Sequence, residues 1–112
     1  MDALNGKRLV ILGMARQGTA LARFAVNAGA AVTLSDMRPA GKLTAAIDSL
    51  ADLPVDRLRY VLGDHPFSLL DECDILALSG GISTELPLVV EAQARDIPLT
   101  NDSLEFLHRS PA

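Results

Sequence analysis

The sequence contains little cysteine, few aromatic residues and no zinc-binding pattern. Its 112 residues include one cysteine, no tryptophan and 4% aromatic residues. The single Cys73 cannot form a disulfide within the chain, and so few aromatic rings do not favour a base-stacking surface for single-stranded nucleic acid. His65 and His108 lack the ligand spacing of a zinc site. These absences argue against a disulfide scaffold, a bound metal and a single-strand binding protein.

Charge and hydropathy disfavour two further classes of partner. The net charge is −4, and the lysines and arginines are scattered, so no basic surface for nucleic acid is expected. No apolar stretch approaches the roughly 20 residues needed to cross a bilayer. The start at Met1–Lys7 lacks the basic-then-apolar order of a secretory signal. We therefore expect a cytoplasmic protein with neither a nucleic-acid nor a membrane partner.

The remaining composition is that of an ordinary globular domain. Short apolar runs predict strands, and segments with apolar residues on one face predict helices. Strands are predicted at 8–12, 31–36, 60–63, 75–79 and 97–100; helices at 17–28, 42–50, 87–95 and from about 102; and a helical turn at 66–70. This alternation predicts an α/β fold: a Rossmann-like doubly wound sheet of about five parallel strands, in the order 3-2-1-4-5. Residues 1–112 form a single domain on this interpretation.

Three segments should meet at the carboxyl edge of this sheet, where doubly wound folds bind their ligands. The first is Gly13–Gly18, a G-x-A-x-x-G turn that is close to the dinucleotide-binding pattern and opens a helix. The second is Asp36–Arg38, which ends the second strand, and the third is Ser79–Gly81, which follows the fourth. Together they predict a nucleotide site, with phosphate at the start of the first helix.

Other interpretations of these segments remain open. Gly13–Gly18 can be a tight turn without a ligand, Arg16 a solvated charge, and Asp36 a helix cap or loop carboxylate. An aspartate at the end of the second strand can bind the ribose of NAD or accept the imide N–H of a uracil ring. A methyl group at Ala15 disfavours the close approach of an NAD pyrophosphate. A uridine site is therefore one hypothesis, and an NAD-binding module of a dehydrogenase or regulatory nucleotide sensor is the alternative.

No catalytic residue is assigned. Cys73 lies among apolar residues on a predicted helix, and a buried thiol explains it better than a nucleophile does. His65 precedes a proline and is typical of a turn, and Ser79 lacks the G-x-S-x-G pattern of hydrolases. The acids at Asp71, Glu72 and Asp74 are expected to be solvated.

An ordered set of motifs covering nearly the whole chain resembles one family. The set is Gly6–Gly13, the helix at Gly18, Ser35–Pro39, Gly63–Pro66, Ser79–Ile82, Leu86–Leu88 and Ile97–Phe106. It resembles the N-terminal domain of UDP-N-acetylmuramoyl-L-alanine:D-glutamate ligases, which are Mur ligases of peptidoglycan synthesis. The family usually has glycine where Ala15 stands and proline where Gly80 stands.

The resemblance implies that the domain holds the UDP end of UDP-N-acetylmuramoyl-L-alanine. On this basis the diphosphate lies at Arg16, Gln17 and Gly18, the uracil at Asp36, Met37 and Arg38, and the phosphates and amino sugar near Ser79 and Gly81. The family's ATP-dependent addition of D-glutamate, which supports the cell wall, cell shape and cell division, needs a P-loop and Mg²⁺ ligands. The chain contains no P-loop sequence. We therefore expect ATP and Mg²⁺ to bind a covalently linked ATP-binding domain, this segment to bind no cofactor, and this segment alone to be inactive.

Overall fold

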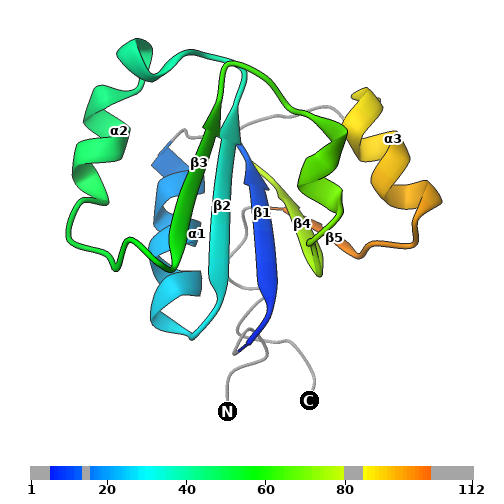
Figure 1. Cartoon of the computed structure of the whole chain (residues 1–112), viewed down its shortest axis with the longest axis horizontal. Coiled ribbons are helices and arrows are strands. Elements are labelled where there is room, and N and C mark those ends of the chain that lie inside the picture. The colour runs from blue at the N-terminus through cyan, green and yellow to red at the C-terminus, as the bar shows by residue number, and fades with distance from the viewer. Residues whose placement is uncertain (1–5, 14–15, 80–84, 102–112) are drawn as a thin grey trace.

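A computed structural model of the chain describes residues 6–13, 16–79 and 85–101. Their core is a sheet of five parallel strands in the order β3-β2-β1-β4-β5 (Figure 1). The strands are β1 (Arg8–Leu12), β2 (Ala31–Asp36), β3 (Leu58–Leu62), β4 (Ile75–Leu78) and β5 (Leu99–Asn101). The predicted α/β class and strand order are therefore confirmed. Because β1 lies between β2 and β4, the loops that follow these strands emerge side by side.

One face of the sheet is covered by α1 (Arg16–Asn27) and α2 (Thr44–Ser49), which follows a short 3₁₀ turn, η1 (Ala40–Lys42). α1 runs behind the strands in the view of Figure 1. Alternate residues of each strand point to this face, as the pleat requires, and Leu9, Ile11 and Leu34 are at most 1% exposed there. α1 ends at Asn27, and Gly29, whose φ is +96°, then adopts the left-handed conformation that turns the chain toward β2.

The other face carries a smaller core under α3 (Pro87–Ala94) and a second 3₁₀ turn, η2 (Phe67–Leu70). Val10, Leu12 and Leu76 point to this face and pack with Leu88 and Val89 of α3. Pro87 occupies the first turn of α3, where its missing N–H is tolerated. The two cores meet only through the sheet, so the fold has helical layers on both sides of the strands.

Several predicted boundaries shift in the structure, including those of β3 and β5. β3 begins at Leu58 instead of Tyr60 and ends before Gly63, whose φ is +90°. β5 begins at Leu99 instead of Ile97, because Ile97 N–H bonds to the carbonyl oxygen of Ala92 in α3. Cys73 is not on a helix as predicted: η2 ends at Leu70, and the chain then extends into β4. The helix predicted from about 102 lies outside the described residues.

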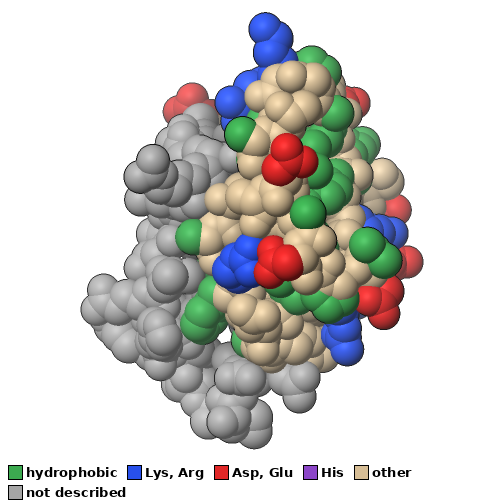
Figure 2. Space-filling model, turned by 90° about the vertical axis from the view of Figure 1, so that its left-hand side faces the viewer, with side chains coloured by type: hydrophobic (Ala, Val, Ile, Leu, Met, Phe, Trp, Pro, Cys, Tyr) green, Lys and Arg blue, Asp and Glu red, His purple; other side chains and the backbone are tan. Residues whose placement is uncertain are grey.

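Charged side chains are scattered over the surface that carries α2 and the edge strand β3. Lysine, arginine, aspartate and glutamate side chains lie interspersed with apolar ones on this side of the molecule (Figure 2). This view shows no continuous basic area of the kind that binds nucleic acid. Within the described part of the chain, no helix is long and apolar enough to cross a membrane.

Candidate functional site

The turn that follows β1 is fixed by Gly13. Its φ of +99° lies in a region that side chains disfavour, and its N–H donates to the Ser35 carbonyl oxygen at 2.7 Å. The end of β1 is therefore tied to β2 one residue before Asp36. On the other side, Ser79 N–H donates to the Leu12 carbonyl oxygen at 3.0 Å. These two bonds bring the ends of β1, β2 and β4 together, as the sequence pattern predicts.

Gly18, in the first turn of α1, packs directly against this turn. A Cβ atom at Gly18 would lie 2.2 Å from the Gly13 carbonyl oxygen and 2.8 Å from Ser79 Oγ. Real Cβ atoms are not found at such distances from other heavy atoms. The absence of a side chain at Gly18 therefore allows the start of α1 to approach the ends of β1 and β4.

The hydroxyl of Ser79 is buried without a partner. Ser79 is 1% exposed, and its Oγ has no hydrogen-bond partner among the described residues. A buried hydroxyl without a partner costs about 1–3 kcal/mol, so such groups are rare in folded proteins. The hydroxyl lies beside the start of α1, where amide N–H groups and the helix dipole favour an anion. The arrangement can bind a phosphate group through these N–H groups and the serine hydroxyl.

Asp36 ends β2 with a buried carboxylate held by Arg38. Its Oδ1 accepts hydrogen bonds from Arg38 N–H at 2.8 Å and Nε at 3.0 Å, and its Oδ2 accepts one from Nη2 at 2.9 Å. The Asp36 side chain is 7% exposed and that of Arg38 is 53% exposed. The carboxylate raises the pKa of the Arg38 guanidinium through these bonds and through its charge. The guanidinium is therefore oriented by the buried acid and keeps an open face that can stack on a base.

The segment after β3, residues 63–65, packs against the end of β2 beside Asp36. Gly63 N–H donates to the carbonyl oxygens of Asp36, at 2.8 Å, and Arg38, at 3.1 Å. His65 follows, and its Nδ1 lies 2.6 Å from Ser35 Oγ. Burial lowers the pKa of His65, although the charges of Asp36 and Asp64 act in the opposite direction. The sequence predicts only a turn at His65 and gives no sign of this contact with Ser35, which lies 30 positions earlier in the chain.

The predicted site residues differ in how fully the structure places them. Gly18, Asp36, Arg38 and Ser79 lie on the ends of the three strands and the start of α1. Met37 is 57% exposed, beside Arg38. The backbones of Arg16 and Gln17 form the first turn of α1. Gly81 lies outside the described residues. Among the described residues, no group of three or more histidine, cysteine or acidic side chains could hold a metal ion.

Comparison with known proteins identifies the family. The profile of the Mur ligase MurD-like N-terminal domain matches residues 7–101. The chain belongs to this MurD-like family. It is 36% identical over 105 residues to the UDP-N-acetylmuramoylalanine–D-glutamate ligase of Shouchella clausii, and 35% identical over 102 residues to that of Syntrophotalea carbinolica. These alignments cover 93% and 91% of this chain and 22% of each relative, so the chain spans about a fifth of their length.

Solved structures with the same fold include both ligases and dehydrogenases. A pseudomurein peptide ligase type C from Methanothermus fervidus has a TM-score of 0.66 at 22% identity, covering 95% of this chain and 21% of that protein. A shikimate dehydrogenase from Aquifex aeolicus has a TM-score of 0.61 at 17% identity, covering 88% of this chain and 43% of that protein. These similarities show the Rossmann-like fold of the MurD-like domain and leave its ligand to be argued from the site.

Proposed function

We propose that this MurD-like domain binds the uridine diphosphate end of UDP-N-acetylmuramoyl-L-alanine, for an ATP-dependent ligase that adds D-glutamate. The proposal depends on the hydroxyl of Ser79, which is buried and has no hydrogen-bond partner in the part of the chain that the structure describes. A hydroxyl left without a partner lowers stability, and a phosphate oxygen at the start of α1 would accept its hydrogen bond. The two sequence relatives described above are both named UDP-N-acetylmuramoylalanine–D-glutamate ligases, and these names suggest the substrate class.

The diphosphate would lie at the start of α1 and the uracil beside Asp36. Gly18 lets the start of α1 pack against Gly13 and Ser79, and the backbone of Arg16 and Gln17 would offer amide groups to the phosphates. A carboxylate can accept the imide N–H of uracil, and the Arg38 guanidinium can stack on the ring. The two regions are adjacent because Gly13 N–H bonds to the residue before Asp36. Under this proposal, the phosphates and the base of a nucleoside diphosphate would bind at these two adjacent regions.

Chemistry at the acyl carbon would belong to the rest of the ligase. ATP and Mg²⁺ would bind a covalently linked domain, and formation of an acyl phosphate followed by attack of D-glutamate would take place there. The contribution of this domain is binding energy from a part of the substrate that does not react, which positions the reacting carboxylate. On its own, the 112-residue chain should bind uridine nucleotides and catalyse no ligation.

Calorimetric titration with UDP, UMP, pyrophosphate, NAD and NADP tests the proposal. We expect heat of binding with UDP, weaker binding with UMP and pyrophosphate, and none with the two dinucleotides. Tight binding of NAD instead of UDP would select the dehydrogenase-like alternative. No binding of any of the five would contradict a nucleotide site in this chain.

A further inference from the structure

We propose that His65 is a positioning residue for the uracil-binding segment, acting through Ser35. This inference rests on the proposed function and adds a residue to it. Ser35 immediately precedes Asp36, and His65 belongs to the segment after β3. The two side chains join the ends of neighbouring strands at the place where the uracil would bind. His65 itself would not touch the ligand.

The contact is short and lies inside the protein. His65 Nδ1 lies 2.6 Å from Ser35 Oγ, and Ser35 Oγ donates to the Asp64 carbonyl oxygen at 3.1 Å. Ser35 is fully buried and His65 is 9% exposed. The dielectric constant is low in such a place, so hydrogen bonds there are strong and a broken one is costly. The Ser35–His65 pair is therefore a strong constraint on the relative position of the two segments.

The positions of the protons follow from the chemistry of the groups. We assign the single hydroxyl proton of Ser35 to its bond with the Asp64 carbonyl, which can only accept. The short contact with His65 must then use an N–H on Nδ1 as the donor. A neutral ring protonated at Nδ1 satisfies both bonds. The lowered pKa of His65, caused by burial, is consistent with a neutral ring at neutral pH.

The pair acts beyond the last paired residues of the sheet. The β2–β3 ladder ends where Asp36 pairs with Leu62. After that, Gly63 N–H holds the carbonyls of Asp36 and Arg38, and Asp64 Oδ1 accepts from His65 N–H at 2.8 Å. The Ser35–His65 contact prevents this extension from separating from β2. The carboxylate of Asp36 and the guanidinium of Arg38 thus take their position from a segment that carries no predicted ligand contact.

Three variants of the 112-residue chain test the inference by calorimetry with UMP and with pyrophosphate. His65→Gln moves the donor from the Nδ1 to the Nε2 position, His65→Asn keeps a donor close to Nδ1, and Ser35→Ala removes the acceptor. We expect His65→Gln and Ser35→Ala each to weaken UMP binding about tenfold, the effect of one lost buried hydrogen bond. His65→Asn should restore UMP affinity to within about twofold of wild type. Pyrophosphate affinity should stay within about twofold in all three, because the phosphate end does not depend on this segment.

A double variant and a spectroscopic measurement separate positioning from general damage. Ser35→Ala combined with His65→Gln should bind UMP no more weakly than either single variant, because both remove one interaction. In the wild-type chain, nitrogen NMR of the His65 ring should show the Nδ1–H tautomer. That measurement needs no variant to fold. A ring protonated only at Nε2, or equal loss of UMP and pyrophosphate binding in the variants, would overturn the inference.

Failure of the inference is distinguishable from failure of the proposed function. If wild type binds UDP and UMP while His65→Gln and Ser35→Ala bind UMP equally well, only the role of His65 is wrong. If wild type binds no uridine compound, the proposed function is wrong and the role of His65 in it falls as well.

Discussion

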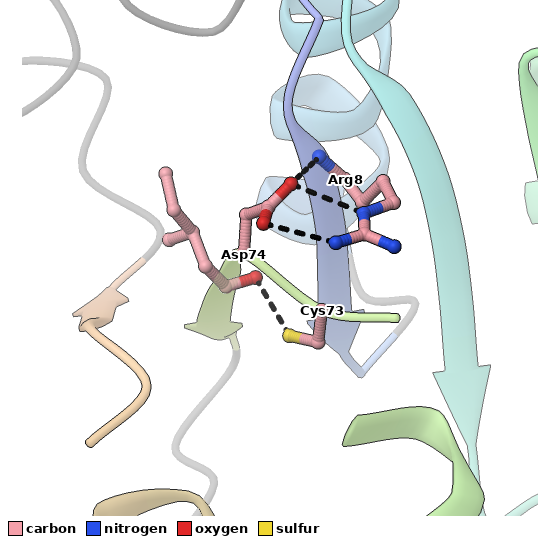
Figure 3. A network of polar contacts seen from close by, with 4 residues as sticks. Arg8, Cys73 and Asp74 are labelled. Carbon is pink, nitrogen blue, oxygen red and sulfur yellow. Dashed lines mark hydrogen bonds and ion pairs between the residues drawn. The ribbon is translucent and has the colours of Figure 1, made fainter. Parts of the chain in front are cut away.

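The two edges of the sheet each carry an aspartate–arginine pair, and the pairs differ in what surrounds them. At the amino edge, Asp74 accepts hydrogen bonds from Arg8 N–H at 2.8 Å, Nε at 3.2 Å and Nη2 at 3.3 Å (Figure 3). Asp74 N–H in turn donates to the Arg8 carbonyl oxygen at 2.8 Å. These bonds extend the pairing of β1 with β4 and link residues far apart in sequence. The amino-edge pair therefore fastens two strands together.

The neighbouring Cys73 also has a structural role and not a chemical one. Its thiol donates to the Ile75 carbonyl oxygen at 3.2 Å, and burial raises its pKa to about 11. A thiol with such a pKa is protonated at neutral pH and is a poor nucleophile. The prediction that Cys73 is a buried thiol is confirmed, although its predicted place on a helix is wrong.

At the carboxyl edge, the aspartate–arginine pair is Asp36 with Arg38, and a nearby strand end carries a buried hydroxyl that lacks a partner among the described residues. Asp36 and Arg38 are two residues apart, so their contact fastens no second strand. Gly18 is closely packed against the Gly13 carbonyl oxygen and Ser79, and Ser79 Oγ lacks a partner among the described residues. At the amino edge, the polar groups of Arg8 and Asp74 bond to each other. At the carboxyl edge, the hydroxyl of Ser79 has no such partner among the described residues and is available to a ligand. This difference supports the carboxyl edge as the binding site.

The largest expected effect comes from adding a side chain at Gly18, where the start of α1 is closely packed. Gly18→Val should lower the free energy of unfolding by about 3 kcal/mol or more and abolish UDP binding, because its Cβ would overlap the Gly13 carbonyl and Ser79 Oγ. Urea unfolding and calorimetry measure the two quantities. Gly41→Ala is the control, since nothing lies within 4 Å of a Cβ there. A stable Gly18→Val variant that binds UDP would show that the carboxyl edge is not closely packed.

The next effect separates the two aspartates. Asp36→Ala should weaken UMP binding by about 1–3 kcal/mol, through the loss of a charged hydrogen bond to the base. Asp74→Asn should leave UMP affinity unchanged, because the amino edge lies at the opposite ends of the strands. Calorimetric titration of both variants with UMP measures the two affinities. Equal affinities in the wild type and Asp36→Ala would remove Asp36 from the site.

A smaller effect compares two buried serines. Ser79→Ala should leave the free energy of unfolding unchanged or raise it by up to about 1 kcal/mol, because it removes an unsatisfied hydroxyl. Ser35→Ala should lower it by about 1–2 kcal/mol, because it removes a hydroxyl with two partners. Urea unfolding measures both in the absence of ligand. A destabilised Ser79→Ala variant would mean that Ser79 Oγ is satisfied in the free chain.

The smallest effect is the acid sensitivity of the amino edge. The bonds from Arg8 lower the pKa of Asp74 below its ordinary 3.8. The stabilisation this gives is present above the ordinary pKa and is lost as the pH falls through the lower pKa of the folded chain. The Asp74→Asn variant should therefore lose less stability than wild type when the pH is lowered below about 4. Urea midpoints measured across this range test it, and identical slopes would contradict a role for this pair in stability.

Much of the fold could be predicted because it depends on local patterns. The apolar run at 8–12 and the alternation of strands and helices predict β1 and the strand order, and both are confirmed. The boundary errors have tertiary causes. Ile97 has strand-like character, but its N–H completes the end of α3. Cys73 follows an apolar helical pattern, but Asp74 must be extended to pair with Arg8.

Some features of the candidate site could likewise be predicted from the sequence, and others could not. The turn at Gly13–Gly18 and the positions of Asp36 and Ser79 after their strands follow from the sequence and the general rule for parallel sheets. The burial of Ser79 Oγ, the Arg38 contact with Asp36 and the Ser35–His65 bond do not.

The sequence by itself therefore determined most of the elements that form and the end of the sheet at which the segments of the predicted site meet. Periodicity and turn residues act over a few positions, and parallel pairing fixes the rest of the arrangement. Only the tertiary structure decided which polar groups satisfy one another. His65 lies 30 positions from Ser35 and Asp74 lies 66 from Arg8, and such groups meet through the register of strands and the path of loops. No local pattern encodes a distance between two side chains that far apart in the chain.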